Sequence, residues 1–305
     1  MKQITSLPLL FIFSLLVLTT CKKTEVIEQE IHMTNFVDTV SVIPPYDGVN
    51  TTIVENYVNK LYIDLIGREP TTAELKADAA TLKNNDLDQD SRETVISGVI
   101  SSSEYYNRFF EIASDNMLNG IDSITMEQDG IGLLEVIKNM ALLNGDTATA
   151  DLADIEILKL RAVLDATGEY RKGLITINEY HRRFVFNYAY DQINMGSENF
   201  IVSCFENLLY RLPTDDETSN GVTMVDGAPA FIFLQEGQSK EDFVSIITQV
   251  DDFYEGLVVG VYLNLLLRKP TSIEMADATE ELLNSTSTYQ ELQKELTKTQ
   301  EYAGF

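Results

Sequence analysis

The sequence is organised around the segment LYIDLIGREPT at residues 61–71, which recurs twice further along the chain. The later copies are CFENLLYRLPT at residues 204–214 and VYLNLLLRKPT at residues 261–271. Each copy holds an aromatic residue, an Asp or Asn two residues later, an Arg, a Pro-Thr pair and a Glu three residues after the Thr. These recurring motif residues are Arg68, Pro70, Thr71, Glu74, Arg211, Pro213, Thr214, Glu217, Arg268, Pro270, Thr271 and Glu274. The chain therefore repeats one structural unit three times.

Each copy predicts a helix–turn–helix corner. Apolar residues before the Pro recur at intervals of three and four, as at Val54, Val58 and Leu61, which indicates one face of a helix. The Pro pushes the residue before it out of the α region, so the first helix should stop near the Arg. The Thr then caps a second helix, and the Glu three residues later completes a capping box that contributes roughly 1 kcal/mol.

The recurring arginines have a structural interpretation. Each follows an Asp or Asn by four residues, which is a favourable helical spacing for pairing. We therefore expect the pairs Arg68–Asp64, Arg211–Asn207 and Arg268–Asn264. From the last turn of the helix, each cation should also offset the helix dipole. All the motif residues are thus predicted to direct folding.

The resemblance between the copies extends beyond the corner. Each copy ends on a small or polar residue, an acid and an aromatic, and the closing aromatics are Tyr105, Phe253 and Tyr302. The intervening length suits about three helices, and units of this size stack on their neighbours to bury their apolar faces.

The segment between the first and second copies, residues 111–200, also predicts helices, at 132–144, 151–166 and 176–191. Thr176 and Glu179 suggest a capping box at the start of the last one. Strand signals are sparse after residue 52. We predict an all-α fold, a helical repeat-like bundle of three related helix-turn-helix units after an extended N-terminal tether. The predicted parts are a signal peptide at 1–20, a tether at 21–52, an N-terminal helical domain at 53–170 with the first repeat and the insertion, and a C-terminal helical domain at 171–305 with the other two repeats.

The first residues read as a bacterial lipoprotein signal peptide. Lys2 precedes a run of about a dozen apolar residues, which is too short for a membrane-spanning helix of roughly 20 residues. The sequence Leu-Thr-Thr-Cys at 18–21 resembles a lipobox, in which Cys21 is acylated and becomes the first residue of the mature protein. We therefore expect an outer-membrane lipoprotein, held by acyl chains such as palmitate on Cys21 and facing the periplasm or the cell exterior, with the cell surface favoured. Simple secretion is the alternative.

The formal net charge of −26 excludes some partners. A chain this acidic repels phosphate backbones and anionic lipid surfaces, so neither nucleic-acid binding nor electrostatic membrane docking is expected.

No residue pattern identifies a catalytic or metal site. His32 and His181 are far apart and lack ligand-like spacing, and Cys204 reads as a small buried hydrophobe. Asp86, Asp88 and Asp90 alternate as at the start of a calcium loop, but the Gly at the sixth position and the Glu at the twelfth are missing. The tyrosines and phenylalanines of residues 180–190 have helical spacing typical of core. We expect no cofactor and no metal.

The first unit and its closing Ser-x-Glu-Tyr turn resemble an uncharacterised bacterial extracellular helical family whose unit reads Leu-Tyr-x-x-Leu-Leu-Gly-Arg-x-Pro. The stretch from Tyr57 to Thr71 carries this resemblance best, because Gly67 becomes Tyr210 and Leu267 in the later copies. The first unit is also similar to an N-terminal domain that accompanies planctomycete cytochrome-like proteins, and remotely similar to phycobilisome linker domains. The resemblance implies a helical fold with a role in assembly or binding, and it brings no catalytic residues.

The leading functional hypothesis is a non-enzymatic, lipid-anchored accessory or scaffold subunit of an outer-membrane or cell-surface protein complex, for secretion, outer-membrane protein assembly or nutrient uptake. The alternative is a surface glycan- or peptide-binding lipoprotein, which should expose the tyrosines Tyr180, Tyr188, Tyr190 and Tyr210. A second alternative is a hydrolase with two carboxylates in a cleft.

Overall fold

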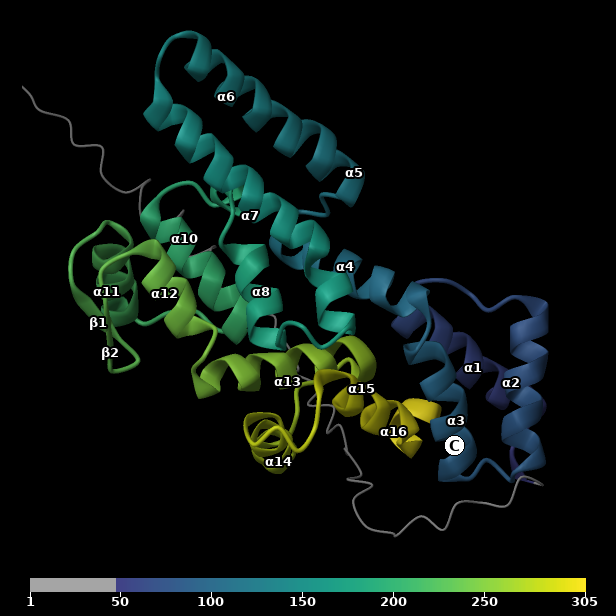
Figure 1. Ribbon diagram of the computed structural model, residues 1–305. Coiled ribbons are helices and arrows are strands. Elements are labelled where there is room, and N and C mark those ends of the chain that lie inside the picture. The colour runs from purple at the N-terminus through teal and green to yellow at the C-terminus, as the bar shows by residue number, and fades with distance from the viewer. Residues whose placement is uncertain (1–47) are drawn as a thin grey trace, which may run out of the picture. The chain divides into compact units, whose positions relative to one another are not determined.

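The computed structural model describes residues 48–305, and these residues are predominantly helical (Figure 1). Within that range the strands are β1 (Ala230–Ile232) and β2 (Gln235–Gly237), so the predicted all-α class is confirmed. The predicted signal peptide, Cys21 and nearly all of the tether lie outside the described residues. The last two residues of the predicted tether, Thr51 and Thr52, instead form the first turn of α1, because Asn50 caps that helix through its side chain.

The three repeats form related corners. The opening helices are α1 (Thr51–Ile66), the π-helical turn η3 (Phe205–Leu209) that continues α10 (Ser197–Cys204), and α13 (Asp251–Leu266). The helices after the Pro-Thr pair are α2 (Thr72–Asn84), α11 (Asp215–Val225) and α14 (Ser272–Leu283). The capping box is present at the start of all three second helices, with the Thr and Glu side chains satisfying each other's backbone N–H groups.

A third helix and a closing helix complete each unit. The third helices are α3 (Gln89–Ile100), α12 (Lys240–Ile247) and α15 (Tyr289–Lys298). The closing helices are α4 (Ser103–Met117) in the first unit and α16 (Gln300–Ala303) in the last. In the second unit the closing helix is α13, which also opens the third unit. The second and third repeats therefore share one helix.

The residue after each opening helix has a left-handed backbone. Its φ is +76° at Gly67, +52° at Tyr210 and +56° at Leu267. Only Gly adopts this conformation without steric cost, which explains the Gly of the first copy. Tyr210 compensates by packing, since its hydroxyl lies against Gly260 of α13. The Leu267 side chain is 86% exposed and has no such packing to compensate.

Leu267→Gly should therefore stabilise the protein. A left-handed non-Gly residue costs roughly 1–2 kcal/mol, and the greater chain entropy of Gly offsets up to roughly 1 kcal/mol of the gain. We expect a net increase in the free energy of unfolding of up to about 1 kcal/mol, measured by urea denaturation. A decrease would show that the exposed Leu267 side chain contributes to folding.

The first and third repeats pack directly on each other. The Tyr57 hydroxyl donates to the Thr297 carbonyl at 3.0 Å, and the Tyr302 hydroxyl donates to the Asp64 carboxylate at 2.9 Å. The buried guanidinium of Arg92 donates to the Lys298 carbonyl at 2.8 Å. Asp64 is thus a partner of Tyr302. These contacts join helices that the predicted boundary after residue 170 would assign to different domains, and that boundary stays a prediction.

The insertion after the first repeat contains α5 (Ser123–Thr125), the π-helical turn η2 (Met126–Ile131), α6 (Gly132–Leu143) and α7 (Thr147–Arg171). In Figure 1, α6 and α7 run side by side as a helical hairpin, and α7 separates α6 from α8 (Ile177–Val185). The predicted helices at 132–144 and 151–166 are present. α7 begins four residues before the predicted start because Asp146 caps it at Thr147, and it continues to Arg171.

The predicted helix over 176–191 is wrong beyond its first half. The chain forms α8 (Ile177–Val185) and then α9 (Tyr188–Ile193), because the buried Asn187 side chain caps Tyr190 N and donates to the Phe184 carbonyl. Thr176 does cap α8, but the Glu179 carboxylate pairs with Arg183 at 3.0 Å. The two strands were also missed: β1 and β2 are only three residues each and turn through Phe233 and Leu234, both with positive φ.

Candidate functional site

The recurring arginine of each repeat joins two acids that are distant in sequence. Arg68 donates through Nη1 and Nη2 to the capping-box Glu74, at 2.9 and 2.8 Å, and through Nε and Nη2 to Glu104 of α4, at 2.6 and 2.8 Å. Its Nη1 also donates to the Glu69 carbonyl at 3.0 Å. All five guanidinium N–H donors are therefore used, and we call this arrangement an arginine clamp.

The same clamp forms in the other two repeats. Arg211 joins Glu217 and Asp252, and Arg268 joins Glu274 and Glu301, with N–O distances between 2.6 and 3.1 Å. The sequence-based pairing with Asp64, Asn207 and Asn264 is therefore wrong. Each opening helix ends two residues before its Arg, so the cation lies outside the last turn and reaches the next helix instead.

The clamps account for two further features of the repeat. The acid of the closing signature, Glu104, Asp252 or Glu301, is the second partner of each Arg, a role that sequence reasoning missed. The aromatic near the start of the motif lies beneath the guanidinium, with ring-to-Cζ distances of 5.5 Å for Tyr62, 4.9 Å for Phe205 and 5.3 Å for Tyr262. The recurring Arg, Thr, Glu and aromatic side chains and the closing acid thus meet at one corner.

The clamps lower the pKa values of their carboxyl groups. Hydrogen bonds from the Arg, supported by the Thr backbone N–H, lower the pKa of Glu74, Glu217 and Glu274 to about 2. The same hydrogen bonding raises the pKa of each Arg. Since about a third of the Arg68 and Glu74 side chains is exposed, solvent screens the pair and reduces its contribution to stability. The perturbed groups are structural pairs.

The other candidates from the sequence lie in the core or cap helices. Burial lowers the pKa of His181 to about 4 and raises that of the Cys204 thiol to about 12. Asp88 caps α3 at Ser91. Between residues 48 and 305, no three His, Cys, Asp or Glu side chains gather in a way that could hold a metal ion.

The tyrosines of residues 180–210 are mostly core. Tyr180 and Tyr190 are fully buried, and Tyr188 and Tyr210 are half-buried. The Tyr180 ring stacks on Phe109 of α4 at 4.6 Å between centroids. The exposed aromatic groove that a glycan-binding protein would need is therefore not formed by these residues.

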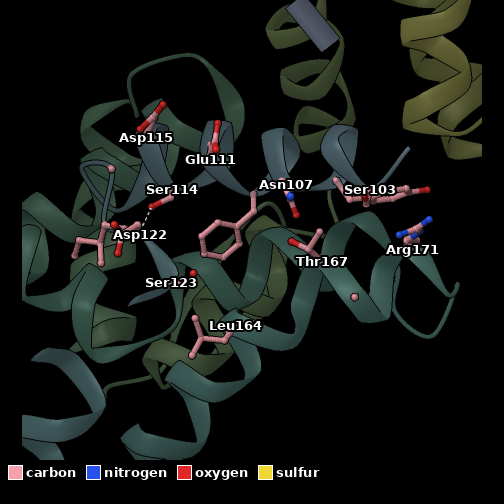
Figure 2. A pocket seen from close by; sticks show the side chains of 15 residues that line it. Ser103, Asn107, Glu111, Ser114, Asp115, Asp122, Ser123, Leu164, Thr167 and Arg171 are labelled. Atoms are coloured by element: carbon pink, nitrogen blue, oxygen red, sulfur yellow. Dashed lines mark hydrogen bonds between the residues drawn. The ribbon is translucent and has the colours of Figure 1, made fainter. Parts of the chain in front are cut away.

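A groove with a volume of about 570 Å³ lies between α4 and α7 (Figure 2). One full face of α4 forms one wall, and Leu164, Thr167, Gly168 and Arg171 of α7 form the other. The loop before α5 closes one end. The α4 wall consists of Ser103, Tyr106, Asn107, Phe110, Glu111, Ser114 and Asp115. Because this face mixes polar, aromatic and acidic residues, no sequence signal distinguishes it from a solvent-exposed helix face.

The outer face of α6 carries an exposed apolar stripe. Leu133, Val136, Met140 and Leu143 follow one another at intervals of three and four residues, and their side chains are 49%, 55%, 58% and 87% exposed. The opposite face, with Leu134 and Ala141, is buried where α6 packs on α7. A helix that is apolar on both faces has one face without a partner.

None of the helices within residues 48–305 has the length and apolar character that crossing a membrane requires. Comparisons of this chain with protein families, with curated proteins and with solved structures found no match.

Proposed function

We propose that this protein is a non-enzymatic, lipid-anchored accessory or scaffold subunit of an outer-membrane or cell-surface protein complex. The observation that supports this proposal best is the α6 stripe formed by Leu133, Val136, Met140 and Leu143. Contiguous apolar surface of this kind on a soluble domain marks a protein-contact site. The acyl chains expected on Cys21 would hold the protein at the membrane.

The recurring charged residues also support a structural role. The three arginine clamps use the motif's Arg and Glu side chains to join helices, which leaves the repeats without an obvious reactive group. The partner is expected to be a different protein, since a net charge of −26 opposes association of two copies.

Site-specific photo-cross-linking from α6 tests the contact. A photoreactive amino acid at Leu143, expressed in the native bacterium, should form a discrete cross-linked species in the membrane fraction. The same amino acid at the exposed Leu174, which lies in the loop after α7, should not. Equal cross-linking from both positions would indicate random collisions and count against the proposal.

Substitutions on the stripe provide the second test. Met140→Glu combined with Leu143→Glu should abolish recovery of the partner, because charged side chains resist burial in an apolar interface. The thermal midpoint should stay near that of the unmodified protein, since both side chains are more than half exposed. Leu174→Glu is the matched control. Unchanged recovery with the double variant would contradict a role for α6.

A further inference from the structure

The groove between α4 and α7 differs in charge along its length. Glu111, Asp115 and Asp122 lie toward one end, and Ser103 and Arg171 lie toward the other (Figure 2). Phe110, Leu164 and Ile121 contribute apolar surface to its lining. A ligand with an apolar stem and a cationic end would match the acidic half of this groove.

The dimensions suit a short extended peptide. Ser103 and Asp115 are twelve residues apart on α4, which is roughly 18 Å at the 1.5 Å rise of an α-helix. An extended segment of about five residues spans this length at roughly 3.3 Å per residue. The volume of about 570 Å³ is within the usual range for ligand sites.

The aromatic residues of the groove are poorly placed to stack on a sugar. The Arg171 guanidinium lies over the Tyr106 ring, with its Cζ 4.9 Å from the centroid. Phe110 packs edge-to-face with Phe184 at 5.5 Å. Since a sugar needs an open ring face, these contacts favour a peptide over a glycan.

The acidic end has capacity for a cationic group. No hydrogen bond joins the Asp115 carboxylate to another residue within 48–305, while Glu111 makes one long contact of 3.2 Å to Arg108. The Asp122 carboxylate at the same end caps α5 by accepting from the Thr125 N–H. The net charge of −26 further attracts a cation to this end.

We propose that this groove binds an arginine or lysine side chain presented by an extended segment of the partner protein. The aliphatic stem of that side chain would lie along Phe110 and Leu164, and its charged end would meet Asp115 and Glu111. Asn107, Thr167 and Arg171 provide hydrogen-bond donors for the segment's backbone carbonyl groups. The inference rests on the proposed function, and it specifies which chemistry of the partner is recognised.

A peptide-binding measurement tests the proposal with the full chain purified in detergent. The probe is a five-residue peptide of four glycines with a central arginine, acetylated and amidated at its ends, and binding is followed by isothermal titration or NMR shifts. The matched peptide has citrulline, which is uncharged and nearly isosteric with arginine. We expect at least tenfold weaker binding of the citrulline peptide, because it removes the positive charge and keeps the stem.

The protein variants are matched in charge. Asp115→Asn should weaken binding of the arginine peptide by about tenfold, whereas Glu127→Gln, which removes one negative charge on η2 away from the groove lining, should change it less than twofold. Equal effects of the two variants would show that the peptide is attracted only by the overall negative charge of the protein, and would overturn the groove assignment. If a neutral oligosaccharide bound more strongly than the peptide, and Asp115→Asn weakened that binding, the ligand of the groove would be a glycan and the peptide proposal would be wrong.

The outcomes separate this inference from the proposed function. Binding of the arginine peptide without any cross-link from α6 supports the groove and refutes the role of the stripe. A cross-link from α6 together with equal binding of the arginine and citrulline peptides supports the role of the stripe and refutes the groove as a site for a cationic side chain.

Discussion

Gly256→Ala is expected to destabilise the protein by about 3 kcal/mol or more. A Cβ atom at Gly256 of α13 would overlap the Leu208 carbonyl oxygen and lie 3.0 Å from Leu209 Cα, both backbone atoms of η3. Overpacking usually costs about 1–3 kcal/mol, and the cost should be at the upper end here because backbone cannot rotate away as a side chain can. Urea denaturation at constant pH measures the change.

The matched control for this prediction is Gly98→Ala on α3. A Cβ atom at Gly98 meets nothing within 4 Å, so Ala should raise the free energy of unfolding by about 0.5–1 kcal/mol through helix propensity. A similar, small effect of both substitutions would show that α13 can move away from η3, and that the close approach is unimportant for folding.

Arg268→Ala should lower the free energy of unfolding by about 2 kcal/mol at pH 7. The substitution leaves Glu274 and Glu301 without their bidentate partner, and hydrogen bonds to charged groups contribute roughly 1.5–3 kcal/mol. The value is well below the sum of the individual contacts, since about a third of the Arg268 side chain is exposed. Arg268→Lys should recover only part of the loss, because Lys cannot form the planar fork.

Arg161→Ala is the control for the clamp, since Arg161 makes a single exposed contact of 3.3 Å to Glu135. Its loss should cost less than about 0.5 kcal/mol. If Arg161→Ala and Arg268→Ala had equal effects, the clamp would contribute no more than an ordinary surface ion pair.

The pH dependence of stability provides a second readout of the clamps. Glu74, Glu217 and Glu274 have a folded pKa of about 2, below the ordinary value of 4.5, so the unfolded chain binds protons more readily than the folded one. Their stabilisation is complete above about pH 5 and is lost as the pH falls toward 2. The variant Arg268→Ala should lose stability less steeply over this range, because Glu274 then titrates near its unfolded value.

The local sequence predicted the corners well because their chemistry is local. The left-handed Gly67 ends the first helix before Pro70, while Thr71 and Glu74 start the second, and all of them act within a few residues. The interruption at Asn187 was missed because it depends on the side chain being buried. The strands β1 and β2 are too short to show a period in sequence.

The sequence alone could not predict the partners of the arginines, the groove or the exposed stripe of α6. Asp64 lies four residues before Arg68, which is the favoured spacing for a side-chain pair on a helix, so the sequence predicted Asp64 as the partner of Arg68. The actual second partner, Glu104, is 36 residues away. The groove depends likewise on α7 lying across α4, and the α6 stripe resembles an ordinary core face until the structure shows that nothing described covers it.

The sequence by itself determined that this protein is an all-α repeat, where each corner turns, and that its charge disfavours nucleic acid. These properties follow from backbone capping, helical periodicity and net charge, which need no knowledge of distant contacts. Only the tertiary structure decided which acids each Arg joins, that α13 serves two repeats, and which surfaces remain open for a partner. Those depend on how helices pack, because packing brings together residues whose separation in sequence carries no information about their distance in space.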